Sequence, residues 1–189
     1  KTNLLTLVNF FDVIKQDFCF YNRKYYSPIK ENFNFFSFIK SILFPNFALV
    51  FWYRIYSSLY SSESKFLRRV GYLLYLRTSR RYSCDIHPSA TIGVPFKVGH
   101  AFNIVIGAGV RVGNGCYIFN GVTLGNKNVG CDNLMPNVEN SVIIGTGAKV
   151  LGNIRVGNNS IVGANSIVIK NIPDNEVWAG MPARCIKKN

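Results

Sequence analysis

The sequence contains few residues of several types that commonly define a protein class. Its 189 residues include five cysteines, an odd number with no CxxC pair and no framework spacing. This usage argues against a disulfide-stapled secreted domain and favours a reducing compartment. The longest uncharged apolar run, residues 41–53, contains Pro45 and is too short for a bilayer span, which needs about 20 residues. Charged residues from Asp12 to Asp17 interrupt the N-terminal apolar stretch, so we expect no cleavable signal and a cytoplasmic location, with membrane-surface contact left open.

Acidic residues are also scarce. The chain has 22 lysines and arginines against nine aspartates and glutamates, a net charge of +13. Residues 1–84 hold 13 of the basic and four of the acidic residues, so they carry most of the excess. This balance predicts an acidic ligand, such as a phosphorylated cofactor, an anionic glycan, a membrane surface or a nucleic acid. No nucleic-acid-binding motif accompanies the charge, and we expect no nucleic-acid partner.

The sequence does contain a six-residue repeat between Ile86 and Val168. Glycine follows most of the repeating aliphatic residues, and a second small or apolar residue often stands four places after them. This is the signature of a hexapeptide β-helix, whereas an antiparallel sandwich would alternate with a period of two. The aliphatic positions are Ile86, Ile92, Val98, Ile106, Val112, Ile118, Leu124, Ile144, Val150, Val156, Val162 and Val168.

The repeat predicts a parallel β-solenoid in which three units close a triangular coil of about 18 residues. Aliphatic side chains would stack in columns along the axis, while backbone hydrogen bonds join neighbouring coils. Gly and Asn at the predicted corners 113–115 and 157–159 tolerate the positive φ that tight corners need. The spacing does not fix the handedness, since parallel crossovers are normally right-handed.

The register breaks at two places, which are the first places to seek function. The step from Val98 to Ile106 is eight residues, so two extra residues bulge out around His100. The step from Leu124 to Ile144 is 20 residues, which we interpret as three units plus two, with an extruded loop at about 125–140. Loops on a rigid scaffold commonly carry binding groups.

Residues 1–84 have a different character and form a separate region from the β-helix of 85–189. Phe, Tyr, Leu and Ile recur at helical intervals with a single glycine, which predicts helices at about 4–18, 33–44, 47–60 and 65–77, the last capped by Ser62 or Ser64. The aromatic residues are interpreted as packing residues or a subunit contact. A basic, aromatic surface for a membrane or a glycan is the alternative.

The chain has two histidines, and His100 lies in the first register break. Asp85 precedes it by 15 residues, which places this carboxylate on the adjacent coil near the same corner. A contact between the two would fix the imidazole tautomer and stabilise the imidazolium. His87 is interpreted as a cap on the first coil.

Several motifs resemble the hexapeptide acyltransferases, specifically the serine acetyltransferase branch. The resemblance covers residues 85–188 and implies a left-handed β-helix, a homotrimer with active sites between subunits, and acetyl-coenzyme A as the donor. It implies that His100 is the catalytic histidine and Asp85 its partner, with no metal. The matching segments are DIHPSATIG (85–93), GHA (99–101), GVTLG (121–125), IGTGAKVLGNI (144–154) and AGMPAR (179–184).

The resemblance also implies a mechanism and a cofactor path. The thioester is already activated, so a base for the acceptor hydroxyl, a donor to the oxyanion and placement of both substrates suffice. The pantetheine arm would pass Asn126, Thr146 and Ala164. Arg184, Lys187 and Lys188 are candidates for the phosphates of coenzyme A, although a solvated basic terminus explains the lysines equally well.

Departures from the family pattern concern the acceptor. Gly99 stands where serine acetyltransferases have an Asp, and Leu134 and Met135 stand where they have an Arg-His pair that handles the amino acid. The helical region is also shorter. Both features resemble instead the offshoot of this family that O-acetylates sugars in bacterial capsule or exopolysaccharide synthesis. We therefore expect an O-acetyltransferase that acts on a saccharide hydroxyl of an acidic capsular polysaccharide or exopolysaccharide. The alternatives are a serine acetyltransferase, an N-acetyltransferase acting on an amino sugar, or a noncatalytic β-helix that binds a partner.

Overall fold

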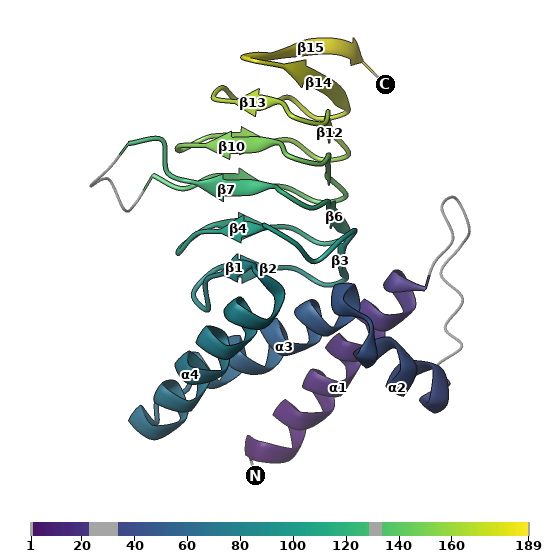
Figure 1. The fold of residues 1–189 in the computed structure, drawn as a ribbon, viewed down its shortest axis with the longest axis vertical. Helices are drawn as coiled ribbons and strands as arrows, with labels where there is room; N and C mark the ends of the chain where they lie inside the picture. The colour runs from purple at the N-terminus through teal and green to yellow at the C-terminus, as the bar shows by residue number, and fades with distance from the viewer. Residues whose placement is uncertain (1, 23–33, 129–133, 189) are drawn as a thin grey trace.

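The computed structural model describes residues 2–22, 34–128 and 134–188, of which 2–9 by backbone alone. Four helices form one end of the molecule, and a parallel β-solenoid rises from them toward the C-terminus (Figure 1). The predicted β-helix with an N-terminal helical region is confirmed.

The helices begin and end at recognisable signals. The Asn34 side chain accepts hydrogen bonds from two backbone N–H groups of the second helix, and Ser64 caps the fourth, as predicted. Ser83, in the left-handed region with φ of 50°, ends the fourth helix two residues before the first strand. The helices are α1 (Thr2–Tyr21), α2 (Phe35–Leu43), α3 (Pro45–Tyr60) and α4 (Lys65–Tyr82).

The solenoid has three faces, and each face is a sheet in which the solenoid strands run parallel to one another. The first sheet contains β1 (Asp85–Ile86), β4 (Val105–Ile106), β7 (Thr123–Gly125), β10 (Lys149–Leu151) and β13 (Ile167–Val168). The second contains β2 (Thr91–Ile92), β5 (Arg111–Val112), β8 (Asn137–Val138) and β11 (Arg155–Val156). The third contains β3 (Phe96–Val98), β6 (Cys116–Ile118), β9 (Ile143–Ile144) and β12 (Ile161–Val162), and it ends in the hairpin of β14 (Glu176–Gly180) and β15 (Ala183–Lys188).

The aliphatic columns form the core, as the repeat predicts. All twelve aliphatic repeat positions are buried, and those from Ile106 onward are at most 3% exposed. This core extends without a break into α3, through Leu49, Val50, Tyr53 and Tyr56. Burial of these columns is the main stabilising contribution that the repeat makes to the fold.

The first register break is confirmed, and the second is larger than predicted. Asp85 pairs with Val105, 20 residues later, whereas an unbroken coil joins Val105 to Thr123, 18 residues later. Thr123 pairs with Lys149, 26 residues later, so this coil holds eight extra residues. Val138 is 1% exposed and occupies a column position within the predicted loop. Val138 was not identified from the sequence because Glu139, and not the glycine typical of the repeat, follows it. Residues 129–133 of the loop lie outside the described residues.

A ladder of polar side chains runs along the corner between the second and third sheets. Each side-chain oxygen accepts the backbone N–H of the equivalent residue one coil nearer to the helices. Asn114 accepts from Val94, Asn140 from Asn114, Asn158 from Asn140, and Asp174 from Asn158, at 2.9–3.1 Å. These bonds satisfy backbone donors at a tight corner, where the strand ladders do not continue.

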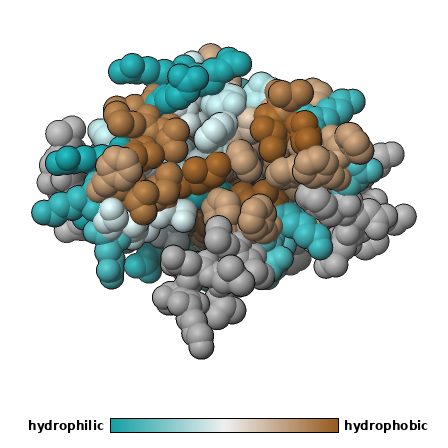
Figure 2. Space-filling view, turned by 90° about the horizontal axis from the view of Figure 1, so that it is seen from below, coloured by the Kyte–Doolittle hydropathy of each residue, from teal (hydrophilic) through white to brown (hydrophobic). Residues whose placement is uncertain are grey.

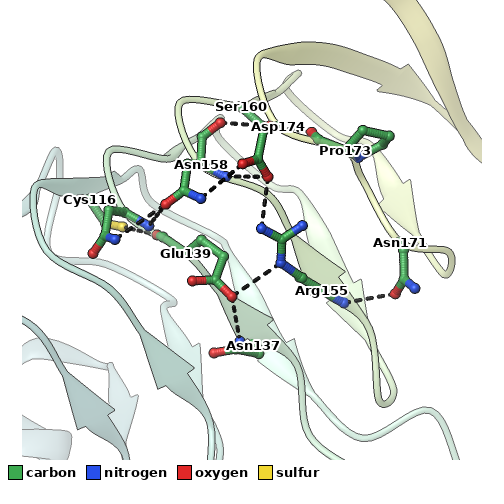
Figure 3. Close-up of polar contacts among 10 residues, drawn as sticks. Cys116, Asn137, Glu139, Arg155, Asn158, Ser160, Asn171, Pro173 and Asp174 are labelled. Carbon is green, nitrogen blue, oxygen red and sulfur yellow. Dashed lines mark hydrogen bonds and ion pairs between the residues drawn. The ribbon is translucent and has the colours of Figure 1, made fainter.

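Arg155 joins the upper part of this ladder to Glu139. Its guanidinium lies 3.2 Å from Glu139 Oε1 and 2.8 Å from Asp174 Oδ1 (Figure 3). Hydrogen bonds from Asn158 and Arg155 hold the pKa of Asp174 below its usual range. The groups are solvent-exposed, so we assign this corner a structural role of small energetic weight.

Helix α3 closes the open end of the solenoid. The first coil has no coil beneath it, so its backbone carbonyls would otherwise lack partners, as at any sheet edge. Polar side chains of α3 donate to them: Tyr56 to Ile86 at 2.6 Å, Ser57 to Pro88 at 3.0 Å, Tyr53 to Ala90 at 2.7 Å, and Arg54 to Ile92 and Gly93.

The face of the helical region turned away from the solenoid is partly apolar. Figure 2 shows apolar residues on this face with hydrophilic residues along its border. Phe36 and Leu43 of α2 are 82% and 79% exposed. Among the described helices, none alone is long and apolar enough to cross a membrane. The bent pair α2 and α3, at 96°, meets the length and hydropathy test only jointly.

Candidate active site

The bulge that carries His100 lies at the corner between the third and first sheets, which we call the His100 corner (99–104, 119–122, 145–148 and 163–166). Backbone bonds fix the bulge on both sides. Gly99 donates to Ile118 of the next coil at 2.8 Å, and Asn103, with φ of 52°, donates to Ser83 at 2.9 Å. The predicted bulge is therefore an ordered corner of the scaffold.

The His100 side chain is exposed, in contrast to the buried columns on either side of it. Phe102, two residues later, is 61% exposed, and its N–H donates to the His100 carbonyl at 2.9 Å. Among the described residues, no hydrogen bond or ion pair involves the imidazole. An imidazole with accessible nitrogens can accept a proton from a bound substrate.

Gly99 lies against an aromatic ring of the next coil. A Cβ at this position would lie 2.7 Å from Cδ1 of Phe119, which is closer than real contacts allow. Phe119 stacks on Tyr117 with ring centroids 4.4 Å apart, and Lys97 lies over the Tyr117 ring. The space that an aspartate side chain would take at position 99 is therefore filled by Phe119.

Asp85 is on the adjacent strand near the same corner, as predicted, but its carboxylate contacts a helix. Oδ1 accepts a hydrogen bond of 2.6 Å from Tyr75 of α4, and burial and this bond raise the pKa of Tyr75. No hydrogen bond or ion pair joins Asp85 to His100, both of which are described. The pairing of Asp85 with His100 stays a prediction, and Tyr75 is a contact that the sequence gave no means to foresee.

His87 packs at the base of the first coil. Its ring makes edge contacts with the rings of Tyr60 and Tyr75, and Nδ1 accepts the backbone N–H of Ser89 at 3.1 Å. Burial lowers the pKa of His87, and the nearby Asp85 partly offsets this. These contacts agree with its interpretation as a cap of the first coil.

Thr146 and Ala164 lie one above the other on the His100 corner. Asn165 donates its N–H to the Thr146 carbonyl at 2.7 Å, and a Cβ at Gly145 would lie 2.7 Å from the Ala164 nitrogen. Both side chains are exposed and small. Asn120, a neighbour of the Thr146 hydroxyl at 3.3 Å, was not identified from the sequence because no motif marks it.

Asn126, Leu134 and Met135 lie at a different corner, between the first and second sheets, which we call the loop corner (87–90, 107–110, 126–128, 134–136 and 152–154). Figure 1 shows the chain that follows β7 leaving on the side away from β3, β6 and β12. Leu134 is 41% exposed. Met135 is half-buried against its own solenoid, its Cε 3.6 Å from where a Cβ of Gly107 would lie. One chain therefore does not bring these residues together with His100.

The three candidate phosphate-binding cations lie on β15, at the end opposite the helices. Arg184 and Lys187 are exposed. Lys188 lies 3.4 Å from Glu176, whose pKa is lowered first by a hydrogen bond from Trp178 and also by Lys188. Within the described part of the chain, no group of three or more His, Cys, Asp or Glu side chains could hold a metal ion.

No family model matches the chain, but comparisons with known proteins identify serine acetyltransferases as relatives. A serine acetyltransferase of Buchnera aphidicola is 43% identical over 140 residues, 72% of this chain and 49% of that protein. One of Bacillus pumilus is 35% identical over 155 residues, 81% of this chain and 70% of that protein. The crystal structure of the Brucella abortus serine acetyltransferase with coenzyme A has a TM-score of 0.83 at 30% identity, covering 98% of this chain and 71% of that one. The chain spans about half the length of the Buchnera relative.

These findings correct the expectation about the acceptor. The prediction of a saccharide O-acetyltransferase with a capsular or exopolysaccharide partner is wrong, because the relatives over most of the chain are serine acetyltransferases. Gly99, Leu134 and Met135 show only that the charged residues of the family pattern are missing at three positions. The absence of these charges does not identify a sugar as the acceptor. The membrane-surface contact also finds no support in these relatives. By sequence and by structure, the chain belongs to the serine acetyltransferase family.

Proposed function

We propose that the protein is a serine O-acetyltransferase that transfers the acetyl group of acetyl-coenzyme A to the hydroxyl of serine. The observation that carries this proposal is the position of His100. It is an exposed imidazole on an ordered bulge, at the same corner as the small residues Thr146 and Ala164, in a chain whose relatives are serine acetyltransferases.

His100 would act first as a base and then as an acid. It takes the proton of the serine hydroxyl as the oxygen attacks the thioester carbonyl, which forms a tetrahedral intermediate. The intermediate collapses with cleavage of the carbon–sulfur bond, and the imidazolium returns its proton to the departing thiolate. General base catalysis of this kind typically contributes about 10²- to 10⁴-fold in rate.

The donor would lie along the His100 corner. Thr146 and Ala164 have side chains small enough for the pantetheine arm to approach the backbone of adjacent coils. Asn126 is the third proposed contact of this arm. Arg184 and Lys187, exposed on β15, would contact the phosphates, while Lys188 would first have to leave Glu176.

A homotrimer is the assembly that we propose. Asn126, Leu134 and Met135 are at the loop corner and His100 at another corner, separated by the first sheet. Side-by-side packing of solenoids would bring the loop corner of one chain to the His100 corner of the next. Closed rings of this kind use one heterologous contact repeated around a threefold axis.

The test is release of the coenzyme A thiol from acetyl-coenzyme A with L-serine, with O-acetylserine identified by mass. His100→Ala should lose at least a hundredfold in kcat, in keeping with loss of a general base. His87→Gln is the matched control because it removes the other histidine, and L-alanine is the control acceptor because it lacks the hydroxyl. Equal turnover by the wild-type protein and His100→Ala, or equal thiol release with alanine, would refute the proposal.

A further inference from the structure

The side chain of Asn46 contacts the backbone on both sides of His100. Its Nδ2 donates to the Gly99 carbonyl at 2.5 Å, and its Oδ1 accepts the Ala101 N–H at 2.9 Å. A single carboxamide thus binds the residue before and the residue after the imidazole. These partners are 53 and 55 residues away along the chain.

Asn46 is held on a rigid support. It lies in the first turn of α3, directly after Pro45, whose fixed φ suits the start of a helix. Phe47 and Ala48, the next residues, are each 1% exposed. The position of the carboxamide is therefore determined by the packing of α3 against the first coil and β3.

The backbone conformation of the bulge depends on the contact with Asn46. Gly99 belongs to the first coil, which has no coil beneath it, so its carbonyl faces the helices, and the Ala101 N–H of the bulge also bonds to α3 rather than to a neighbouring coil. Gly99 also has more backbone freedom than any other residue type. Without the carboxamide both groups lose their partner, and the backbone beside His100 loses its only side-chain support among the described residues.

The other α3 side chains at this edge behave differently. Tyr53, Tyr56 and Ser57 each donate to one carbonyl of the first coil, and none of these carbonyls belongs to a residue adjacent to His100. Asn46 both donates and accepts. A carboxamide has one donor group and one acceptor oxygen in the same plane. Aspartate has a similar shape but can only accept, and leucine can neither donate nor accept.

We propose that Asn46 is a positioning residue that holds His100 in the orientation required for its role as a base. This inference rests on the proposed function, because it assigns a purpose to the orientation of that imidazole. A displacement of about 1 Å at a reacting group can reduce the rate by about a hundredfold. Loss of Asn46 should therefore reduce kcat by about ten- to a hundredfold without weakening acetyl-coenzyme A binding.

The first test observes the imidazole itself and needs no activity. The chain has two histidines, so a spectrum of the imidazole Cε1–H groups contains two signals, assigned with His87→Gln. In Asn46→Ala the His100 signal should change in chemical shift or line width, while the His87 signal stays in place. Ser57→Ala is the matched control, because it removes another α3 bond to the first coil and should leave the His100 signal unchanged.

If Asn46→Ala does not fold, Asn46→Asp replaces it, because aspartate keeps the shape and the acceptor but loses the donor to Gly99. The same change in the His100 signal is expected. A folded Asn46 variant with both histidine signals at their wild-type positions would overturn the inference.

The second test separates this inference from the proposed function. We expect Asn46→Ala to lower kcat with serine while KM for acetyl-coenzyme A stays within about twofold, and Ser57→Ala to change neither. Unchanged kcat in Asn46→Ala, with His100→Ala inactive, would overturn the positioning role alone. Full activity of His100→Ala would instead refute the proposed function, and the histidine spectrum would still decide whether Asn46 orients the ring.

Discussion

Gly99 determines what can lie beside His100. Its missing side chain leaves room for Phe119, whose ring lies where a Cβ would be, 2.7 Å from the nearest ring carbon. The stack of Phe119 on Tyr117 extends this apolar contact within the same coil, from the corner to β6 of the third sheet. Gly99 and the ring of Phe119 are therefore complementary in shape. The effect of a substitution at one position on the free energy of unfolding should depend on the residue at the other.

We expect Gly99→Asp to destabilise the protein by about 1–3 kcal/mol, the usual effect of overpacking a filled site. Gly99→Asp/Phe119→Leu should recover most of this loss, because the smaller side chain vacates the space. Urea unfolding measures the free energy of unfolding of the single and the double variant. Additive effects of the two substitutions would contradict the proposed steric conflict.

The resemblance assigns the position of Gly99 to recognition of the serine ammonium group. In the double variant, and not in the single one, KM for serine should fall about tenfold, since a charge-assisted hydrogen bond contributes about 1.5–3 kcal/mol. Steady-state kinetics with varied serine test this, with KM for acetyl-coenzyme A as the internal control. An unchanged serine KM in a stable double variant would show that position 99 does not contact the acceptor.

His87 makes the folded state sensitive to pH. Burial lowers its pKa, and protonation of Nδ1 would break the bond that this atom accepts from Ser89. The unfolded chain binds the proton near pH 6.5 and the folded chain at lower pH, so this contribution to stability is lost as pH falls below about 6.5. The free energy of unfolding should therefore fall between about pH 7.5 and 5.5, and His87→Gln should reduce that slope. Chemical unfolding across this range measures it, and equal slopes in the two proteins would contradict the interpretation.

At the scale of elements, α3 joins the helical region to the solenoid. Arg54 of α3 bonds the carbonyls of Ile92 and Gly93 and forms a buried ion pair with Asp17 of α1 at 2.8 Å. Asp17 in turn accepts the backbone N–H of Phe96, the first residue of β3. The strand that leads to His100 is thus attached to two helices.

Arg54→Met should cost about 3–5 kcal/mol, because it leaves the Asp17 carboxylate, 1% exposed, without its partner. Asp17→Asn/Arg54→Met should cost less than the single change, since no unpaired charge is then buried. Urea midpoints give the comparison. The matched exposed substitution is Arg155→Met, whose pairs are solvent-exposed and which should cost much less than Arg54→Met. Equal losses in Arg54→Met and Arg155→Met would contradict this account.

At the scale of the whole molecule, one core continues from α3 through the solenoid. His100 and the residues proposed to contact the acceptor at the loop lie on two different corners of that solenoid. A rigid scaffold holds these corners at a fixed distance, so motion within one chain does not bring them together. The proposed trimer accounts for how they meet.

This assembly predicts complementation between two inactive variants. His100→Ala lacks the base, and Leu134→Asp places a negative charge where the resemblance puts the serine carboxylate. In mixed trimers, about a quarter of the sites combine an intact His100 with an intact loop from the neighbouring chain, because each is present with a probability of one half. Co-expressed variants should therefore recover about a quarter of wild-type turnover. Activity no higher than that of either variant alone would exclude sites shared between chains.

The sequence by itself determined the solenoid, its aliphatic columns, the corner glycines and asparagines, the bulge at His100 and the four helices. These features depend on side-chain volume and backbone geometry that repeat every six residues, so they can be read from local spacing. Tertiary structure decided the rest: Val138 as a column residue, Tyr75 as the partner of Asp85, and Asn46 beside His100. Val138 follows an irregular loop that hides its place in the six-residue period. The contacts of Tyr75 and Asn46 join residues far apart in the sequence, and they exist because α3 and α4 pack against the first coil at an orientation that no local period encodes.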